Sequence, residues 1–456
     1  MKHILVLGAG QSAPYLIHWL LGQARANDWF ITVADRDIKA ASRHVQGHDR
    51  GLGIQLDITD SDMRRTQIAK ADIVVNMMAP KFQHLIAWDC LNHSTHMVSV
   101  SYRDQTIRDL CPDAQRRGIL ILNEIGLDPG IDHMSSMSLI DKIRGQNGVI
   151  TSFISYGSGI PAPESDQNPL KYVITWNPRN VVMAGEHGAQ YLIDGKIKIL
   201  PWHRVFQHSW PVYVDGLGRM EAYPNRDSLS YMKTFGLDEV STMVRGTLRY
   251  PGWSETWLQI VRLGLPNETL RIPNLPQRSF REITEMFIPR HVSGATLESR
   301  VANYLNISQT GKIMENLSWL GLFDDQPCGV RGETSAEAMI ALLQRKLPLG
   351  KDMQDMVVIV HEIIVRYPER NDELEKTVST LLYTGEKNGF TAMAKSVGLP
   401  AALAVKLLLT DELPLLGCHI PTHAAIYRPI LRELEKAGFH FIEKSTPIAQ
   451  GEVSGT

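Results

Sequence analysis

Short apolar-rich runs alternate with longer segments of mixed polarity over the first third of the chain. The apolar-rich runs cover residues 4–7, 30–34, 54–58, 73–76, 97–102 and 119–123. Runs of this length, bounded by polar residues or glycine, are typical of strands buried on both faces. Residues 15–21, after the first run, have the apolar content of a packed helix. Strands that alternate with helices predict an α/β domain with a Rossmann-type, doubly wound parallel sheet.

The pattern changes near residue 149. Shorter β-rich runs follow at residues 151–156, 172–176, 195–200 and 211–214. They predict a second, α+β domain with a mixed or antiparallel sheet. Three later regions are expected to be a mostly helical insertion, an apolar helix and an amphipathic helix, at residues 280–350, 389–409 and 427–436. Between the insertion and the apolar helix, residues 356–360 predict one more strand.

Composition and charge exclude several classes of protein. A chain of 456 residues is longer than one hydrophobic core commonly supports, which indicates two or three domains. The net charge is −2 and no basic stripe is present, so a nucleic-acid partner is not expected. No segment approaches the length of apolar sequence needed to cross a bilayer, and no membrane span is expected.

The cysteines and histidines give no sign of a disulfide framework or a metal site. Cys90, Cys111, Cys328 and Cys418 have no paired spacing, as in the reduced thiols of a cytoplasmic protein. His93 and His96 are three residues apart, but no cysteine or carboxylate nearby completes a ligand set. We therefore predict no metal.

A glycine-rich turn follows the first predicted strand. Gly8, Gly10 and Ala13 form a Gly-x-Gly-x-x-Ala fingerprint that opens the first predicted helix. The first glycine permits the tight turn, the second lets the backbone approach a pyrophosphate, and the alanine lets the helix pack close to the strand. Gln11 and Ser12 complete the turn, whose amide groups and helix dipole would face the phosphates. The alternative is a fold of this type that has lost its ligand.

The second predicted strand ends in Asp35. A carboxylate at this position hydrogen-bonds the ribose hydroxyls of adenosine and repels a 2′-phosphate, which favours NAD. Arg36 could instead stack on adenine or pair with a 2′-phosphate. We predict NAD as the cofactor, with NADP as the alternative.

Three further strand ends are expected to line one crevice, at Met78–Ala79, Ser101–Tyr102 and Gly126–Asp128, because ligands bind at the carboxyl ends of strands in such sheets. Asp128 precedes Pro129 and could cap a helix whose first residue is that proline. The functional alternative is a carboxylate at the mouth of the nicotinamide pocket. The two roles are compatible.

The stretch from Pro161 to Arg179 is rich in proline and predicts a loop. It contains Pro-Ala-Pro-Glu, Asn-Pro-Leu and Trp-Asn-Pro-Arg, which resemble the Pro-Ala-Pro-Glu, Asn-Pro-Leu and Trp-Ser-Pro-Arg signature of saccharopine reductases, the L-glutamate-forming saccharopine dehydrogenases. Gly-Leu-Asp-Pro-Gly-Ile-Asp-His-Met at 126–134 resembles a second motif of this family. The resemblance covers nearly the whole chain and is weakest over 255–350.

The resemblance, together with the motifs above, implies a set of site residues. The expected cofactor-binding residues are Gly8, Gly10, Gln11, Ser12, Ala13, Asp35, Arg36, Asp57, Ile58, Met78, Ala79, Ser101, Leu127 and Trp176. The expected substrate-binding residues are Ser101, Tyr102, Asp128, Arg226, Thr247 and Arg249. Asp128 and Tyr102 are the candidate catalytic residues for proton transfer.

Four positions depart from the family. Asn177 and Asn180 replace the serine and the glycine of a Trp-Ser-Pro-Arg-Gly motif. Gly157 aligns with a position where the family commonly has a cysteine, so any role of that thiol is absent from this chain. Asp35 stands where many NADP-dependent members have no acid, which supports the expectation of NAD.

The implied activity is an oxidation or reduction at the CH–NH group of saccharopine. Hydride would move between the secondary amine and the nicotinamide, and the imine would be hydrolysed to, or formed from, L-glutamate and 2-aminoadipate 6-semialdehyde. A carboxynorspermidine-type dehydrogenase or another imine reductase is one alternative. The dicationic substrate of the former would need acidic residues where this chain has Arg226 and Arg249. The other is a non-catalytic nucleotide-sensing protein.

The expected organisation is a cytoplasmic homodimer acting on a small amino-acid substrate, without a nucleic-acid or membrane partner. The dinucleotide-binding domain is expected at residues 1–130 plus about 390–456. The α+β substrate-binding and dimerisation domain is expected at 131–280 plus about 351–389, and the small helical insertion at about 281–350.

Overall fold

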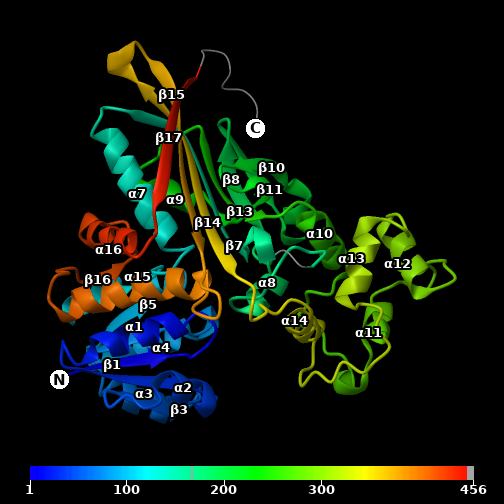
Figure 1. Ribbon diagram of the computed structural model, residues 1–456, viewed down its shortest axis with the longest axis horizontal. Coiled ribbons are helices and arrows are strands. Elements are labelled where there is room, and N and C mark those ends of the chain that lie inside the picture. Colours follow the sequence, from blue (N-terminus) through cyan, green and yellow to red (C-terminus); the bar gives the residue numbers. More distant parts are fainter. Residues whose placement is uncertain (166–167, 449–456) are drawn as a thin grey trace. The chain divides into compact units, whose positions relative to one another are not determined.

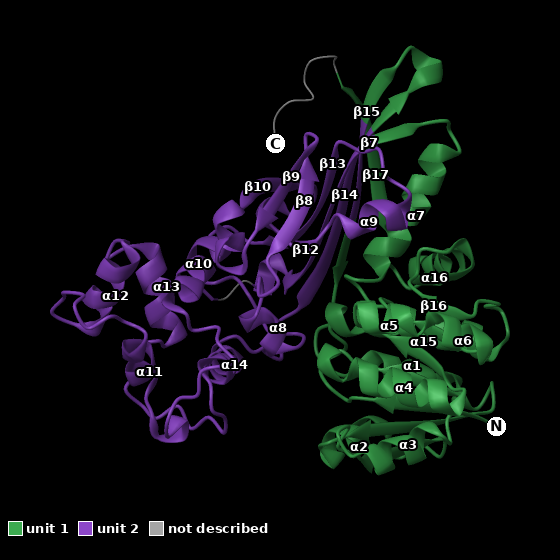
Figure 2. Cartoon of the chain, turned by 180° about the vertical axis from the view of Figure 1, so that it is seen from behind, with its two compact units in different colours: residues 1–150, 365–375, 381–456 green, residues 151–364, 376–380 purple. Residues whose placement is uncertain are grey.

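The computed structural model describes residues 1–165 and 168–448. It divides into two compact units, shown in different colours in Figure 2. Unit 1 comprises residues 1–150, 365–375 and 381–456, and unit 2 comprises residues 151–364 and 376–380. Residues 166–167 of the predicted loop and 449–456 of the predicted first domain lie outside the described residues.

A parallel sheet forms the centre of unit 1 (Figure 1). Within the described residues it has seven strands in the order β16-β6-β5-β4-β1-β2-β3. Its strands are β1 (Lys2–Leu7), β2 (Trp29–Asp35), β3 (Gly51–Gln55), β4 (Ile73–Asn76), β5 (His96–Ser99), β6 (Leu120–Leu122) and β16 (Gly417–His419). All six strand pairings are parallel. The predicted doubly wound sheet is confirmed, although β16 was not expected and β3 ends before Asp57.

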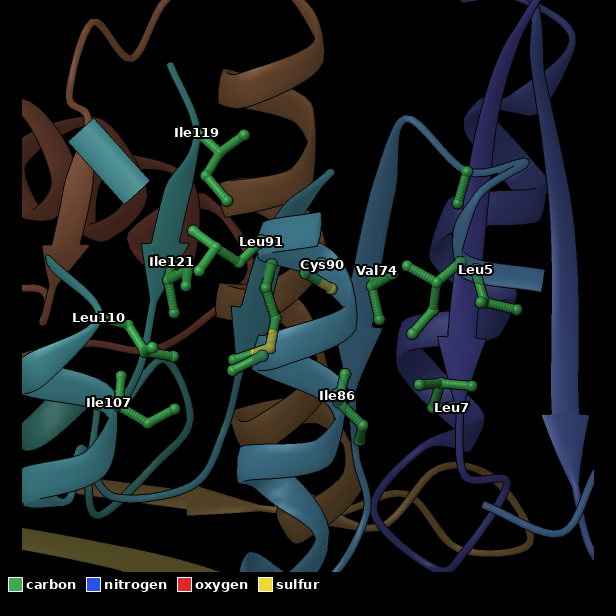
Figure 3. Packing of buried hydrophobic residues seen from close by; sticks show 14 of the residues in the cluster. Leu5, Leu7, Val74, Ile86, Cys90, Leu91, Ile107, Leu110, Ile119 and Ile121 are labelled. Atoms are coloured by element: carbon green, nitrogen blue, oxygen red, sulfur yellow. The ribbon is translucent and has the colours of Figure 1, made fainter. Parts of the chain in front are cut away.

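Helices cover this sheet and close its core. They are α1 (Pro14–Ala24), α2 (Ile38–Val45), α3 (Ser61–Ile68), α4 (Gln83–His93), α5 (Gln105–Asp109), α6 (Cys111–Arg116), α7 (Ile131–Arg144), α15 (Ala392–Leu409) and α16 (Ala424–Lys436). Figure 3 shows side chains of β1, β4 and β6 packed against those of α4 and α5, all within one buried apolar cluster. Removing such surface from water stabilises the fold by about 25 cal/mol per Å².

The apolar helix α15 packs against α1. A Cβ atom added at Gly398 would lie 2.7 Å from the backbone nitrogen of Leu16, so only glycine allows this approach. By length and composition alone α15 could cross a membrane, although no membrane span was expected from the sequence. In the structure 67% of this helix is buried inside the protein. Its contacts with α1, β4 and β5 make it a core helix of unit 1.

Helix α7 extends unit 1 beyond the expected boundary at residue 130. It packs against α16, and the Tyr427 hydroxyl on α16 hydrogen-bonds the carboxylate of Asp141. Lys142 also pairs with Glu443. Both contacts join α7 to residues that are distant in the sequence and belong to unit 1. The first segment of unit 1 therefore ends at Ile150.

A second sheet is mixed, as predicted. Among the described residues it has ten strands, in the order β10-β11-β13-β7-β14-β15-β17, with β8, β9 and β12 attached beside this path. Strand β7 pairs in parallel with β13, whereas β10, β11 and β13 pair antiparallel. The strands are β7 (Val149–Pro161), β8 (Ala189–Ile193), β9 (Lys196–Leu200), β10 (Trp210–Val214), β11 (Gly218–Pro224), β12 (Arg226–Asp227), β13 (Thr242–Arg249), β14 (Asp355–Tyr367), β15 (Glu373–Thr384) and β17 (Phe441–Ile448).

Unit 2 also contains the helices that were expected as an insertion. They are α11 (Phe280–Met286), α12 (Leu297–Leu305), α13 (Lys312–Leu320) and α14 (Ser335–Lys346), with α8 (Pro178–Val182), α9 (Ser230–Phe235) and α10 (Trp253–Leu263) before them. Among the described residues, unit 2 has 3₁₀ turns at Pro163–Ser165, Trp202–His208 and Leu275–Gln277, and unit 1 has them at Pro80–Phe82 and Pro368–Arg370. Helix α13 contacts α10, and the helical region belongs to unit 2.

The strand predicted at residues 172–176 is wrong. This segment is irregular, and its one ladder contact is an isolated bridge between Ile174 and Pro348. The Asn168 side chain accepts a hydrogen bond from the Leu170 N–H at 3.1 Å and donates one to the Tyr172 carbonyl at 2.8 Å. Local bonds of this kind take backbone groups away from a sheet.

Candidate active site

The glycine-rich turn has the geometry that a dinucleotide phosphate requires. Gly8 has a φ of 99°, and a Cβ there would lie 3.1 Å from the Met78 sulfur. A Cβ at Gly10 would meet nothing within 4 Å, so the turn is open on that side. No side chain among the described residues caps the amino end of α1, which leaves its amide groups for an anion. These residues fit a dinucleotide.

The carboxylate of Asp35 lies beside this turn at the end of β2. Its two oxygens accept hydrogen bonds from the backbone N–H groups of Ala9 and Asp37, at 2.8 and 2.9 Å. The following residue, Arg36, has an exposed side chain. Asp35 therefore has the position expected for an adenosine ribose contact.

A buried ion pair supports the turn that carries Asp57 and Ile58. The Thr59 N–H and hydroxyl donate to Asp57, and these hydrogen bonds lower the pKa of the Asp57 carboxyl. Arg64 donates to the Ile58 carbonyl and to Asp89, both at 2.6 Å. The side chains of Arg64 and Asp89 are 5% and 3% exposed. Neither residue was identified from the sequence, because the pair joins separate helices.

Buried polar side chains join the ends of β4, β5 and β6. The Gln83 side-chain oxygen accepts hydrogen bonds from the Ser99 hydroxyl at 2.9 Å and from the Asn123 amide at 2.8 Å. The Asn76 amide donates to the Ser99 oxygen at 3.2 Å. All four residues are buried. The sequence analysis missed this network, although Asn76 and Asn123 end apolar runs and are unusual there.

This network positions the predicted site residues of the neighbouring loops. The Gln83 amide donates to the Tyr102 carbonyl at 2.9 Å. The Met78 N–H donates to the Asn76 side chain at 3.0 Å, and the Ser101 N–H donates to the Ser99 hydroxyl at 3.3 Å. The strand ends carrying Met78, Ser101 and Tyr102 therefore meet at one edge of the sheet, with Ala79 following Met78.

Asp128 lies half-buried in a turn between Gly126 and Gly130. The turn is closed by the Gly126 N–H, which donates to the Pro129 carbonyl at 3.0 Å. Helix α7 begins only at Ile131, and its N-cap residue is Gly130. The predicted cap by Asp128, with Pro129 as the first helical residue, is wrong because the chain completes this turn before the helix starts. Leu127 precedes Asp128 and is buried.

A buried histidine lies between two carboxylates next to this turn. His133 Nε2 is 2.7 Å from Glu124 Oε2, and His133 Nδ1 is 3.2 Å from Asp132 Oδ2. Burial by itself lowers the pKa of His133, but the Asp132 and Glu124 carboxylates outweigh it and raise that pKa to about 9. The two carboxylates therefore favour the charged form of the imidazole.

In unit 2, Arg249 lies among aromatic side chains and is only 5% exposed. Its guanidinium carbon is 4.9 Å from the ring centroid of Tyr172, 5.8 Å from that of Tyr223 and 5.6 Å from that of Trp253. Nη1 donates to the Ser158 hydroxyl at 2.8 Å. Nε is buried and has no hydrogen-bond partner among the described residues.

Two other predicted residues adjoin the same aromatic rings. The Trp176 indole N–H donates to the Tyr172 hydroxyl at 3.0 Å. Thr247 is the antiparallel partner of Tyr223 in the pairing of β13 with β11. Trp176 was expected to bind the cofactor and lies in unit 2 next to the Arg249 cluster; its cofactor contact stays a prediction. Tyr172 lies in the stretch from Pro161 to Arg179 but was not identified as a site residue.

Arg226 lies apart from this cluster in the sheet. It begins β12, which pairs with β8 rather than with β13. The pKa of the Glu186 carboxyl is lowered mainly by a hydrogen bond with His187, with smaller contributions from the charges of Arg179 and Arg226. Arg245 has its guanidinium carbon 4.4 Å from the Tyr231 ring centroid.

Comparison with known proteins gives matches over nearly the whole chain. The model of the saccharopine dehydrogenase NADP binding domain matches residues 4–122, and that of the saccharopine dehydrogenase C-terminal domain matches residues 126–439. Saccharopine dehydrogenase (NADP(+), L-glutamate-forming) of Saccharomyces cerevisiae is 30% identical, over 97% of this chain and 99% of the yeast protein. The solved apo saccharopine dehydrogenase (L-Glu forming) from that yeast has a TM-score of 0.83 and 29% identity, covering 98% of this chain and 100% of the other.

Some relatives are longer. The mitochondrial alpha-aminoadipic semialdehyde synthase of Rattus norvegicus is 32% identical over 98% of this chain. The chain spans about half of that protein, 48% of its length.

Proposed function

We propose that this chain, which belongs to the saccharopine dehydrogenase family, interconverts saccharopine with L-glutamate and 2-aminoadipate 6-semialdehyde. Family membership confirms the resemblance found in the sequence motifs. The proposal for the activity is supported by the yeast L-glutamate-forming relative, which matches this chain from end to end.

The environment of Arg249 carries the proposal. A buried guanidinium is costly unless an anion pairs with it. Among the described residues no carboxylate forms an ion pair with Arg249, and its buried Nε has no acceptor. A carboxylate can accept two parallel hydrogen bonds from a guanidinium. Saccharopine has three carboxylates, so we assign one to Arg249, with Arg226 as the candidate for a second.

The residues of unit 1 supply the dinucleotide site and the proton-transfer groups. The turn at Gly8–Ala13, Asp35 and the Asp57–Ile58 turn would hold a nicotinamide dinucleotide, which supplies or accepts the hydride when bound. Asp128 is proposed to hold the proton of the substrate amine, and Tyr102 to donate to or accept from the reacting groups. Ser101, beside Tyr102, would orient the substrate.

NAD is proposed as the preferred cofactor. The Asp35 carboxylate beside the glycine-rich turn supports this preference, since its negative charge would repel a 2′-phosphate. NADP remains the alternative, because the yeast relative is named for NADP(+).

The chain is further proposed to be a cytoplasmic homodimer. Its four cysteines are all free thiols, which supports a reducing compartment. Light scattering of the purified protein measures the oligomeric state.

A direct assay tests the proposed reaction. Purified protein is mixed with saccharopine and either NAD or NADP, and reduced nicotinamide and L-glutamate are quantified. Equal amounts of both products support the proposal. Turnover of a carboxylated polyamine but not of saccharopine would identify the alternative dehydrogenase, and dinucleotide binding without turnover of either would identify a nucleotide sensor.

A further inference from the structure

The three charged side chains at the start of α7 form one enclosed unit. The side chains of His133, Glu124 and Asp132 are 1%, 4% and 3% exposed. Each ring nitrogen of His133 faces one carboxylate, Nε2 at 2.7 Å from Glu124 and Nδ1 at 3.2 Å from Asp132. Glu124 follows β6, whereas the other two residues belong to α7.

The second oxygen of each carboxylate binds the backbone of a different loop. Glu124 Oε1 accepts a hydrogen bond from the Arg103 N–H at 2.9 Å. Asp132 Oδ1 accepts one from the Gly130 N–H at 2.6 Å. Arg103 directly follows Tyr102, and Gly130 closes the turn that carries Asp128. The three side chains therefore join the loops of the two candidate proton-transfer residues.

We propose that His133, as an imidazolium, is a positioning residue that fixes the Tyr102 loop relative to the Asp128 turn. The proposal rests on the function assigned to those two residues above. His133 itself would contact neither substrate nor cofactor. It would act through Glu124 and Asp132.

The charge is needed because both ring nitrogens lie within ion-pair distance of a carboxylate, at 2.7 and 3.2 Å. A neutral imidazole would leave these two buried carboxylates without a cation between them. Two buried carboxylates without an intervening cation would also repel each other strongly. The raised pKa of His133, about 9, agrees with this arrangement, and Glu124 and Asp132 are the charged groups responsible. Above that pH the connection between the loops should weaken.

Amide hydrogen exchange without substrate tests the positioning directly. In His133→Gln, exchange at Arg103 and Gly130 should be faster than in the unaltered protein. His84→Gln, which changes an exposed histidine on α4, should leave both rates unchanged. Unchanged exchange at both amides in His133→Gln would overturn the proposal.

Kinetics separate positioning from a purely structural role. We expect kcat of His133→Gln to fall about 10- to 100-fold while the dinucleotide affinity is kept, because small displacements of reacting groups have effects of this size. The decline of kcat in the unaltered protein as pH rises through about 9 should be absent from this variant. A kcat and pH profile equal to those of the unaltered protein would contradict the inference.

Two further measurements cover other outcomes. If His133→Gln does not fold, Glu124→Gln replaces it, since its amide oxygen still accepts from Arg103 while the charge is lost. In the unaltered protein, carbon-13-labelled histidine should show one residue titrating near 9, and a His133 midpoint near its usual 6.5 would overturn the proposal. Because exchange and titration need no substrate, a protein that fails to turn over saccharopine would count against the proposed function alone.

Discussion

The Asp35 carboxylate accepts a hydrogen bond from the Ala9 backbone N–H, with 2.8 Å between oxygen and nitrogen. This bond joins the end of β2 to the glycine-rich turn and fixes a negative charge beside it. A charge fixed at this point can distinguish the two nicotinamide dinucleotides, which differ by a 2′-phosphate on the adenosine ribose.

The first prediction concerns this distinction. Asp35→Asn keeps an acceptor oxygen and removes the charge, so NADP affinity should rise by about tenfold. Two like charges 4 Å apart repel by about 1 kcal/mol in water and about 4 kcal/mol near a protein surface. Calorimetric titration with NAD and NADP measures the change. If the unaltered protein already binds NADP as tightly as NAD, Asp35 does not set the preference.

Arg249→Ala and Arg226→Ala should each raise the KM for saccharopine. Removing one partner of a buried, hydrogen-bonded charge pair costs about 2–5 kcal/mol. Dinucleotide affinity should stay the same in both variants, because neither arginine is among the predicted cofactor-binding residues. Arg219→Ala, which changes an exposed arginine of β11 in the same sheet, is the matched control and should leave KM unchanged. Saccharopine kinetics like those of the control would remove Arg249 and Arg226 from the site.

Asp128→Asn should lower kcat by about tenfold or more, since a positioned acid–base group contributes about 10²–10⁴-fold. Asparagine has nearly the same shape but cannot accept the proton. Because the N-cap residue of α7 is Gly130, the change does not replace the N-cap residue of that helix. Asp109→Asn, at an exposed position, serves as control. Full turnover with an unchanged pH profile would show that Asp128 has no role in proton transfer.

Gly398→Ala should destabilise the protein and weaken dinucleotide binding. The added methyl group would lie 2.7 Å from the Leu16 nitrogen and push α15 from α1, whose first turn borders the predicted phosphate site. Overpacking of this kind costs about 1–3 kcal/mol. Gly22→Ala on α1 is the control: its methyl group meets nothing within 4 Å, and it should stabilise the helix by about 0.4–1 kcal/mol. Urea unfolding compares the two, and equal effects would refute the packing argument.

The stability supplied by His133 should depend on pH with a defined sign. Its pKa is raised from 6.5 to about 9 in the folded protein. Its contribution to the free energy of unfolding is therefore fully present below pH 6.5 and is lost as pH rises through about 9. The difference in this free energy between the unaltered protein and His133→Gln should shrink over that range. A difference that does not vary with pH would mean that the imidazole is not charged in the fold.

Local sequence determined the elements around the dinucleotide site. The run Ile4–Leu7, the glycine-rich turn and the helix after it are adjacent in the chain, and each has a strong local preference. The position of Asp35 is also determined locally, because this residue is the last one of β2. Such features can be predicted because backbone conformation and apolar periodicity depend on neighbouring residues.

Local sequence was misleading where side chains compete with the backbone. The β-rich run 172–176 is irregular because Asn168 binds the backbone of Tyr172. The Asp-Pro sequence at Asp128 looked like a helix start, but the chain first closes a turn in which the Gly126 N–H donates to Pro129.

The contacts that position the site residues were decided by tertiary structure. Gln83 meets Asn123, Arg64 meets Asp89, and Arg249 meets Tyr172, although each pair is far apart in the chain. The pair of Glu124 and His133 likewise forms only when α7 packs beside the end of β6. A sequence pattern records the preference of a residue for burial or for a backbone conformation. It does not record which distant polar group satisfies a buried donor or charge, and that choice is made when the strands and helices pack together.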